Sequence, residues 1–409
     1  MEEFIPQKTI RIPPSVLVDV SGMLPIIHTE YFQKLIERKQ LGLAYKVYPG
    51  GTHTRFEHSL GTLHITRKII RHFKMADQEL TRALEVYALL HDVGHGPFSH
   101  EIEPVLRSNH KERGAIRIQE MEEEISQYAD YDLVLKLFQG KDPFCQIVRD
   151  KNFGADKIDY LQRDALHVGY ELGLNTETII KYLQYQAGYL GVDEKSKEEI
   201  MAYQFSFLRM YIRIYMQKTV KIFARMFQRA LTEYLEKGHD EESIWEMTDA
   251  DIKALLSGHS LMNCIRNRKQ LKTAAVFKID GYEKEERVGN RGYPVYGIEP
   301  NLLLFWSKQI DNPKFLLKLE KQLEAALGLE RDNLIIVQPN FYEKLIPKDV
   351  LLYRKGKGEF ESLFEQVTSH PISLKEMADR AFYIRVAIVP DFLATVRNFN
   401  FKNFFGEQI

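Results

Sequence analysis

An apolar helical stripe leads directly into a run of histidines, and this junction constrains the chain more than any other feature. The stripe over 79–91 consists of Leu80, Leu84, Tyr87 and His91. Their spacing of i, i+4, i+7 and i+11 is that of one helix face, so His91 is predicted to point into a core. Residues 90–100 then read LHDVGHGPFSH. A buried Asp92 needs a charged or hydrogen-bonding partner, so the sequence predicts a polar site inside a helical core.

The apolar patterns divide the chain into a helical part and a mixed part. Helical spacing predominates over 29–235 and includes Leu60–Phe73 and a long aromatic-rich stretch, Met201–Lys237. Residues 237–243, KGHDEES, are typical of a helix stop and a linker. Beyond them, β-branched runs at 273–279, 333–339, 349–354 and 382–390 flank helical patterns at 315–327 and 374–380. We therefore predict a mainly α fold, with a helical domain over 1–236 and a smaller α+β domain over 237–409.

Composition excludes several classes of partner. The chain has 409 residues and 56 Lys+Arg against 57 Asp+Glu, a formal net charge of −1. This balance does not favour a nucleic-acid partner or a polybasic membrane surface. Cys145 and Cys264 stand far apart, so no disulfide framework is expected. With no leader and no 18-residue apolar run, we expect a cytoplasmic protein that does not enter a membrane.

The histidine run has possible metal-ligating partners on both sides. Upstream, HTRFEHSLG (53–61) places His58 at the start of a helical pattern; downstream, GADKIDYLQRDA (154–165) supplies Asp156, Asp159 and Asp164. Mixed imidazole and carboxylate ligands suit Mn, Fe, Ni, Zn or Co, and Mg is also possible. Such a metal lowers the pKa of a bound water. Spacing alone leaves open which aspartate completes the site.

The motifs resemble a known enzyme family. QLGLAYKVYPGGTHTRFEHSLG (40–61), LLHDVGHGPFSH (89–100) and DKIDYLQRDALHVG (156–169) are similar to the deoxynucleoside triphosphate (dNTP) triphosphohydrolases, among the HD-domain phosphohydrolases. The likeness extends to the HD and C-terminal lobes of members that also carry a sterile alpha motif domain, which we expect to be absent here. It implies an HD-domain helical core and a divalent metal held by His58, His91, Asp92 and Asp156. Asp159 then becomes a supporting or structural carboxylate.

The same resemblance implies the residues that act on the substrate. It assigns acid and base roles to His95, His100 and His110. The alternative for His100 and His110 is that they are ordinary surface or helix-capping histidines. Arg55 and Lys157 would hold phosphates, with a salt bridge from Arg55 to Glu57 or Asp92 as the alternative. Contacts to the nucleoside would come from Gln40, Leu41, Tyr160, Asp164 and Tyr215. The γ-phosphate arginine of the family is replaced here by Phe207.

The resemblance implies a nucleotide substrate, hydrolysed to deoxynucleoside and inorganic triphosphate. Two alternatives remain: another HD phosphohydrolase acting on nucleoside monophosphates, cyclic nucleotides or alarmones, and a catalytically silent HD scaffold. We also expect a homo-oligomer, either a dimer or a tetramer. The guanine-nucleotide activator site of the family is not matched, because His28 and Ile36 stand beside Gln33 where the family has an aspartate and an arginine. Guanine-nucleotide activation is therefore not expected.

Overall fold

The structure, a computed structural model, describes residues 8–173, 175–287, 292–338 and 345–409. It divides into two compact units. Unit 1 comprises residues 1–99, 108–210 and 347–372, and unit 2 comprises 100–107, 211–346 and 373–409. The predicted boundary between 236 and 237 falls inside unit 2, at the end of a helix.

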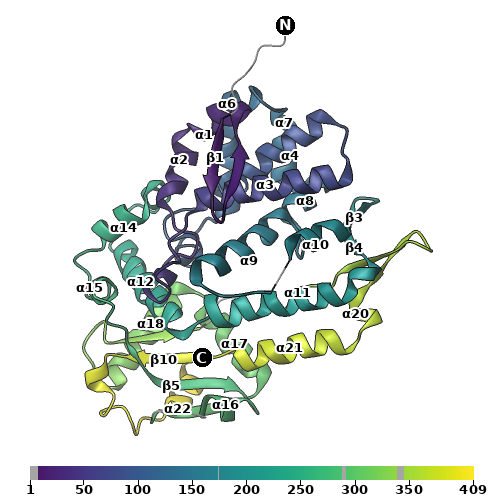
Figure 1. Cartoon of the computed structure of the whole chain (residues 1–409). Helices are drawn as coiled ribbons and strands as arrows, with labels where there is room; N and C mark the ends of the chain where they lie inside the picture. The colour runs from purple at the N-terminus through teal and green to yellow at the C-terminus, as the bar shows by residue number, and fades with distance from the viewer. Residues whose placement is uncertain (1–7, 174, 288–291, 339–344) are drawn as a thin grey trace. The chain divides into compact units, whose positions relative to one another are not determined.

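Unit 1 is built around three packed helices, α3 (Arg55–Phe73), α4 (Gln78–Leu90) and α9 (Ala155–Val168). Helix α3 packs against both of the others (Figure 1). The N-cap side chain of Asp77 accepts from the backbone N–H groups of Glu79 and Leu80 and starts α4 where the apolar stripe begins. The remaining helices of the unit are α1 (Leu24–Ile27), α2 (Glu30–Gln33), α5 (His110–Glu120), α6 (Glu122–Ser126), α7 (Tyr131–Phe138), α8 (Gln146–Arg149), α10 (Thr176–Tyr182), α11 (Lys197–Met210) and α20 (Leu363–Gln366).

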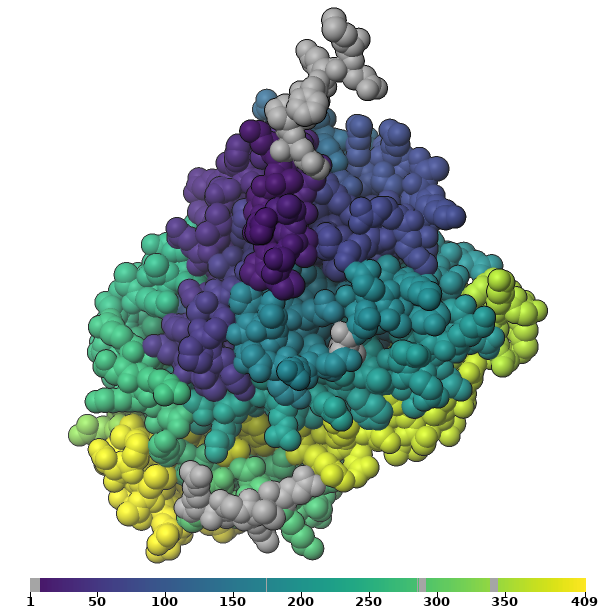
Figure 2. All heavy atoms as spheres, in the orientation of Figure 1, coloured from purple at the N-terminus to yellow at the C-terminus, as the bar shows by residue number. Residues whose placement is uncertain are grey.

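Two small sheets complete unit 1. Strands β1 (Thr9–Ile12) and β2 (Val16–Asp19) form an antiparallel hairpin. It lies on the surface, where the Leu17 side chain is exposed (Figure 2). The second sheet has the order β3-β4-β8-β9, with β3 (Leu183–Gln186), β4 (Tyr189–Asp193), β8 (Leu351–Arg354) and β9 (Glu359–Ser362).

Strand β8 corrects the predicted domain organisation. The run 349–354 was expected in the C-terminal α+β domain, but β8 pairs in parallel with β4, with Val192 opposite Leu352. Both side chains are completely buried. The apolar run predicts a strand, whereas its partner is decided by a pairing across about 160 residues of sequence.

A groove borders the hairpin in unit 1. Its lining is mostly apolar and includes four polar residues. The lining consists of Lys8, Thr9, Ile10, Val20, Leu24, Ile27, His28, Gln33, Ile36 and Phe56. Three of these residues correspond to the activator site of the family. Gln33 is retained there, whereas His28 and Ile36 replace an aspartate and an arginine.

Unit 2 packs helices against a four-stranded sheet of order β6-β5-β10-β7. The strands are β5 (Lys272–Ile279), β6 (Val295–Ile298), β7 (Leu334–Val337) and β10 (Ile384–Ile388). Strand β5 runs parallel to β6, and the other pairs are antiparallel. The helices are α12 (Lys218–Glu236), α13 (Glu242–Glu246), α14 (Asp249–Leu255), α15 (Ser260–Arg266), α16 (Glu283–Arg287), α17 (Pro300–Ile310), α18 (Pro313–Ala326) and α22 (Phe401–Gln408), while α21 (Ser369–Ala381) crosses the boundary between the units.

A buried ladder of ion pairs supports the edge strand β7. Arg225 of α12 forks onto Glu320 of α18 at 3.0 and 2.8 Å, and Glu320 also accepts the N–H of Ile336 at 2.8 Å. One helical turn further, Arg229 and Glu324 repeat the arrangement. The ladder therefore satisfies N–H groups that an edge strand would otherwise leave unpaired.

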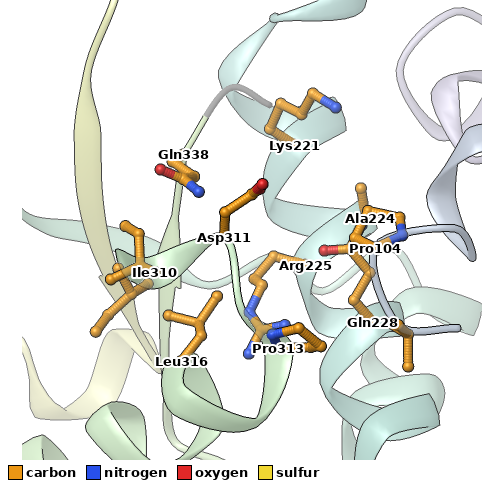
Figure 3. A pocket seen from close by; sticks show the side chains of 12 residues that line it. Pro104, Lys221, Ala224, Arg225, Gln228, Ile310, Asp311, Pro313, Leu316 and Gln338 are labelled. Carbon is orange, nitrogen blue, oxygen red and sulfur yellow. The ribbon is translucent and has the colours of Figure 1, made fainter. Parts of the chain in front are cut away.

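A cavity beside this ladder is lined by Arg225, Lys221, Asp311 and Gln338 among others (Figure 3). Its volume is about 20 Å³, room for one water molecule. It is too small for a nucleotide.

The expected long helix over Met201–Lys237 is interrupted. Helix α11 ends at Met210, the π-helical turn η7 (Tyr211–Tyr215) follows, and α12 begins at Lys218. Gln217 caps α12 by accepting from the N–H groups of Thr219 and Val220. Among the residues that the structure describes, no helix is long and apolar enough to cross a membrane.

Candidate metal centre

Three segments of unit 1 bring imidazole and carboxylate atoms to one point. His58 lies in the first turn of α3, His91 follows the last residue of α4, and Asp156 lies in the first turn of α9. The Nε2 atoms of the two histidines are 3.2 Å apart. An Asp156 carboxylate oxygen lies 3.1 Å from Nε2 of His58 and 3.6 Å from Nε2 of His91. These three residues form a group that is able to hold a metal ion.

The carboxylate of Asp92 adjoins this group. Its oxygens lie 3.7 Å from Nε2 of His58 and 3.6 Å from Nε2 of His91. The side chains of His58, His91 and Asp92 are almost completely buried, whereas that of Asp156 is 27% exposed. Asp156 therefore marks the side on which solvent reaches the group.

The outer nitrogens of both histidines are held by hydrogen bonds. Nδ1 of His58 donates to Asp159 at 2.8 Å, and Nδ1 of His91 donates to the backbone carbonyl of Ala88 at 2.8 Å. With Nδ1–H engaged, neutral rings present unprotonated Nε2 atoms to one another. Two such lone pairs at 3.2 Å repel, so a proton or a cation is required between the donors. A divalent metal meets this requirement, and the mixed nitrogen and oxygen set fits such an ion.

Electrostatics favour a cation at this point. Burial raises the pKa of the Asp156 carboxyl, but hydrogen bonds to His58 and His91 hold it well below its ordinary value. Burial likewise raises the pKa of Asp92, and the nearby His91 and Arg55 outweigh it and lower the pKa. For His58, burial opposes protonation, yet hydrogen bonds to the two aspartates of α9 raise its pKa to about 10. Both carboxylates are thus ionised at neutral pH.

Arg55 is engaged with Asp92 in this structure. Its Nη1 donates to the Asp92 carboxylate, and its Nε donates to the Ser99 hydroxyl at 2.8 Å. Ser99 in turn donates to the Lys39 carbonyl at 2.7 Å. Phe98 and Ser99 both have positive φ, a conformation that costs about 1 kcal/mol or more for a non-glycine residue. The contact matches the alternative interpretation of Arg55 as the partner of Asp92.

Helix α9 carries three of the predicted substrate residues, Lys157, Tyr160 and Asp164. The Tyr160 ring lies edge-on to that of His58, with centroids 6.4 Å apart. Asp164 is buried and accepts from Nε2 of His53 at 2.7 Å. The Lys157 ammonium donates to the Lys151 carbonyl and lies 4.5 Å from the Phe207 ring.

Gln40 and Leu41 lie in the loop before the first turn of α3. The Gln40 N–H donates to the His53 carbonyl at 3.0 Å. Its side-chain Oε1 is buried without a hydrogen-bond partner among the described residues. An acceptor of this kind suits recognition of a donor group on a ligand.

The three predicted acid and base histidines have different surroundings. In unit 1, the rings of His95 and His110 stack with centroids 4.0 Å apart. Burial, followed by Arg55 and His110, lowers the pKa of His95 well below its ordinary value, so this ring is neutral at neutral pH. In unit 2, the His100 side chain is 60% exposed and its Nδ1 lies 3.1 Å from Glu103. Tyr215 also belongs to unit 2, where it packs edge-on against Tyr211.

Several supporting residues were missed by sequence reasoning. Arg149 donates to Asp92 at 3.2 Å, and His53 holds Asp164. Arg163 binds both Asp159 and Glu57. The spacing of Asp159 and Arg163, i and i+4 on a helix, was a signal for that pair. The other contacts join segments that lie far apart in the sequence.

Comparisons with known proteins match the chain to two family models and to several relatives. Residues 55–185 match the HD domain, and residues 175–292 match the HD associated region. An uncharacterized protein of Methanocaldococcus jannaschii is 35% identical over 272 residues, 64% of this chain and 58% of that protein. The deoxynucleoside triphosphate triphosphohydrolase SAMHD1 of Gallus gallus is 31% identical over 206 residues, 39% of this chain and 34% of that protein. The crystal structure of a hypothetical protein from Aquifex aeolicus has a TM-score of 0.70 at 24% identity, covering 96% of this chain and 99% of the other.

The structural match confirms the predicted mainly helical fold. The chain spans 58% of the length of the first curated relative and 34% of the second. The HD-domain match begins at Arg55, the first residue of the helix that carries His58, and includes the segments that carry His91 and Asp156. The two matches together span residues 55–292, so the chain carries an HD domain followed by an HD associated region.

Proposed function

We propose that this HD-domain phosphohydrolase acts on dNTPs and releases deoxynucleoside and inorganic triphosphate. The observation that carries the proposal is the convergence of two imidazole nitrogens and a carboxylate oxygen on one buried point, with Asp92 beside them. The choice of substrate is supported by the partial similarity to a deoxynucleoside triphosphate triphosphohydrolase and by the motifs around Gln40, Lys157 and Asp164.

His58, His91, Asp92 and Asp156 would hold one divalent metal ion. When bound, it would supply Lewis acidity and make hydroxide available at neutral pH. The mixed nitrogen and oxygen ligands suit Mn, Fe, Ni, Zn, Co or Mg. The outer hydrogen bonds at Nδ1 keep both imidazoles turned toward this point.

The chain's own residues would bind and orient the nucleotide. Lys157 follows Asp156 in α9, and its ammonium, which donates to the Lys151 carbonyl in this structure, is the proposed phosphate contact. Burial lowers the pKa of Lys157, and a bound phosphate would favour its charged form. Tyr160 and Asp164, on the same helix, would contact the sugar. His95, which is neutral at neutral pH, is the first proposed acid and base residue, and His100 and His110 are the others.

Arg55 would have to redirect part of its guanidinium to contact a phosphate. Its Nε and Nη1 are engaged by Ser99 and Asp92. A guanidinium presents five N–H donors, so it is able to keep Asp92 and still donate to a phosphate oxygen. Arg55→Lys should therefore impair both Asp92 positioning and phosphate contact.

The test is turnover of a panel of the four dNTPs with Mn²⁺, with products separated by anion-exchange chromatography. We expect deoxynucleoside and triphosphate to appear together, in equal amounts, without dNDP or dNMP. Successive dNDP and dNMP would contradict the proposal and indicate an ordinary phosphatase. Turnover confined to monophosphates or cyclic nucleotides would place the chain with other HD phosphohydrolases, and a metal-loaded protein without any turnover would indicate a silent scaffold.

A further inference from the structure

Arg163 links the helix that carries His58 to the helix that carries Asp156. Its Nε and Nη2 fork onto the two oxygens of Asp159 at 2.8 Å each. Its Nη1 donates to Glu57, the neighbour of His58 on α3, at 2.6 Å. The side chains of Arg163 and Asp159 are only 5% and 7% exposed, and that of Glu57 is 17% exposed. A forked, buried guanidinium of this kind is geometrically specific.

The fork leaves Asp159 little freedom. One of its oxygens, Oδ2, accepts from both Arg163 Nε and His58 Nδ1 at 2.8 Å. The other oxygen is bound by Arg163 Nη2. The carboxylate therefore cannot rotate away from His58 without breaking a charge-assisted hydrogen bond.

Gly61 makes this close approach possible. It lies one turn after His58 on α3, facing α9. A Cβ atom at this position would come within 2.0 Å of Asp159 Oδ1 and 2.2 Å of Arg163 Nη2. Any side chain would thus displace the ion pair that supports His58. The glycine is required by the approach of α9 and not by backbone conformation, because it lies within a regular helix.

Glu57 and Arg163 make further contacts that hold them in place. His167 Nε2 donates to the same Glu57 oxygen at 2.8 Å, and the His167 ring stacks on that of His53 with centroids 4.3 Å apart. Arg163 Nη1 also donates to the carbonyl of Pro13, in the turn of the β1–β2 hairpin, at 3.3 Å. None of these residues supplies an atom to the metal-ligating group.

We infer that Gly61, Arg163 and Glu57 are positioning residues that hold Asp159 against His58 and thereby set metal affinity. The inference rests on the proposed metal site. Partners of this kind orient the ligand ring, and their loss typically weakens metal binding by about 10–100-fold.

The experiment measures the Kd for Mn²⁺ by competition with a fluorescent chelator, without substrate. Gly61→Ala is paired with Gly22→Ala, whose Cβ would come within 2.4 Å of the Tyr128 ring in the same unit. Arg163→Lys is paired with Arg67→Lys, because Arg67 of α3 forks onto Glu85 at 2.9 and 3.0 Å. Each control makes the same substitution at a position away from the metal-ligating group. Gly22→Ala crowds an aromatic ring, and Arg67→Lys disrupts a forked ion pair. Urea unfolding of the metal-free proteins is measured in parallel.

We expect Gly61→Ala and Arg163→Lys to bind Mn²⁺ at least about tenfold more weakly than their controls, at comparable stability without metal. Equal affinity within each pair would overturn the inference, because the network would then be merely structural. If Gly61→Ala does not fold, the comparison of Arg163→Lys with Arg67→Lys tests the inference. Because the readout is metal binding, absence of dNTP turnover would refute the proposed substrate and leave this comparison intact.

Discussion

Replacing Arg229 by Met tests how far the buried ladder stabilises unit 2. The Arg229 side chain is completely buried. Its two terminal nitrogens fork onto Glu324 at 3.0 and 2.9 Å, and its Nε lies 3.2 Å from Glu233. Met preserves the length of the aliphatic stem and removes the charge and its donors. The substitution therefore removes the cation that Glu324 and Glu233 share and that Asp332 also contacts at 3.4 Å.

The magnitude follows from the burial of Glu324. This residue is 4% exposed, and it also accepts the N–H groups of Asn333 and Leu334 at 3.0 and 3.1 Å. Those bonds tie the carboxylate to β7, so it cannot turn toward solvent without unpairing the strand. Removing one partner of a buried ion pair typically costs about 3–5 kcal/mol in the free energy of unfolding. The control Lys321→Met breaks a pair with Glu236 whose members are 45% and 40% exposed, and should cost about 0–1 kcal/mol.

The assay is urea unfolding followed by tryptophan fluorescence. The chain has two tryptophans, Trp245 and Trp306, both buried in unit 2, so the signal reports on that unit. The double variant Arg229→Met with Glu324→Gln should recover part of the loss, because it removes the uncompensated charge. A loss for Arg229→Met no larger than that of Lys321→Met would refute the reasoning.

Three further predictions concern the metal, acid stability and regulation. Asp92→Ala and Asp156→Ala should lose bound metal in elemental analysis, and full occupancy in both would contradict the ligand assignment. Burial raises the pKa of Glu233, but its histidine and arginine partners hold it well below the ordinary 4.5. The unfolded chain then binds this proton more readily, so the urea midpoint of unit 2 should fall as the pH drops below about 4.5, and Glu233→Gln should flatten that slope. His28 and Ile36 line the groove of unit 1 in place of the family's aspartate and arginine. We therefore expect dGTP neither to shift the sedimentation coefficient nor to accelerate dATP hydrolysis. A dGTP-dependent tetramer with faster turnover would show that the groove is an activator site.

The local elements could be predicted because their signals lie within a few residues. The stripe ending at His91 predicted a helix over 79–91, and α4 spans Gln78–Leu90. The β-branched run at 273–279 is β5. The four-residue spacing of Asp156, Tyr160 and Asp164 placed them on one face of α9. Periodicity is a property of the chain itself, so it needs no knowledge of what the face contacts.

The interruption of the helix over Met201–Lys237 was not predicted. Apolar residues continue through the π-helical turn at Tyr211–Tyr215, so the pattern alone gives no stop signal. The regular helix ends because the backbone adopts a π-helical turn at Tyr211–Tyr215, and Gln217 then caps the start of α12. Periodicity likewise did not predict that β8 pairs with β4, because it does not identify the partner of a strand.

The sequence by itself determined the kind of site: histidines and aspartates on inward helix faces, in motifs shared with the HD-domain phosphohydrolases. Only the tertiary structure decided which of these groups meet and what supports them. Arg55 lies against Asp92, Asp159 holds the outer nitrogen of His58, and Arg163 reaches Glu57 across 106 residues of sequence. Helix periodicity states which side of a helix a residue occupies, whereas the choice of neighbour on that side depends on how two helices cross. That crossing is set by packing, and here by a glycine that leaves room for the ion pair.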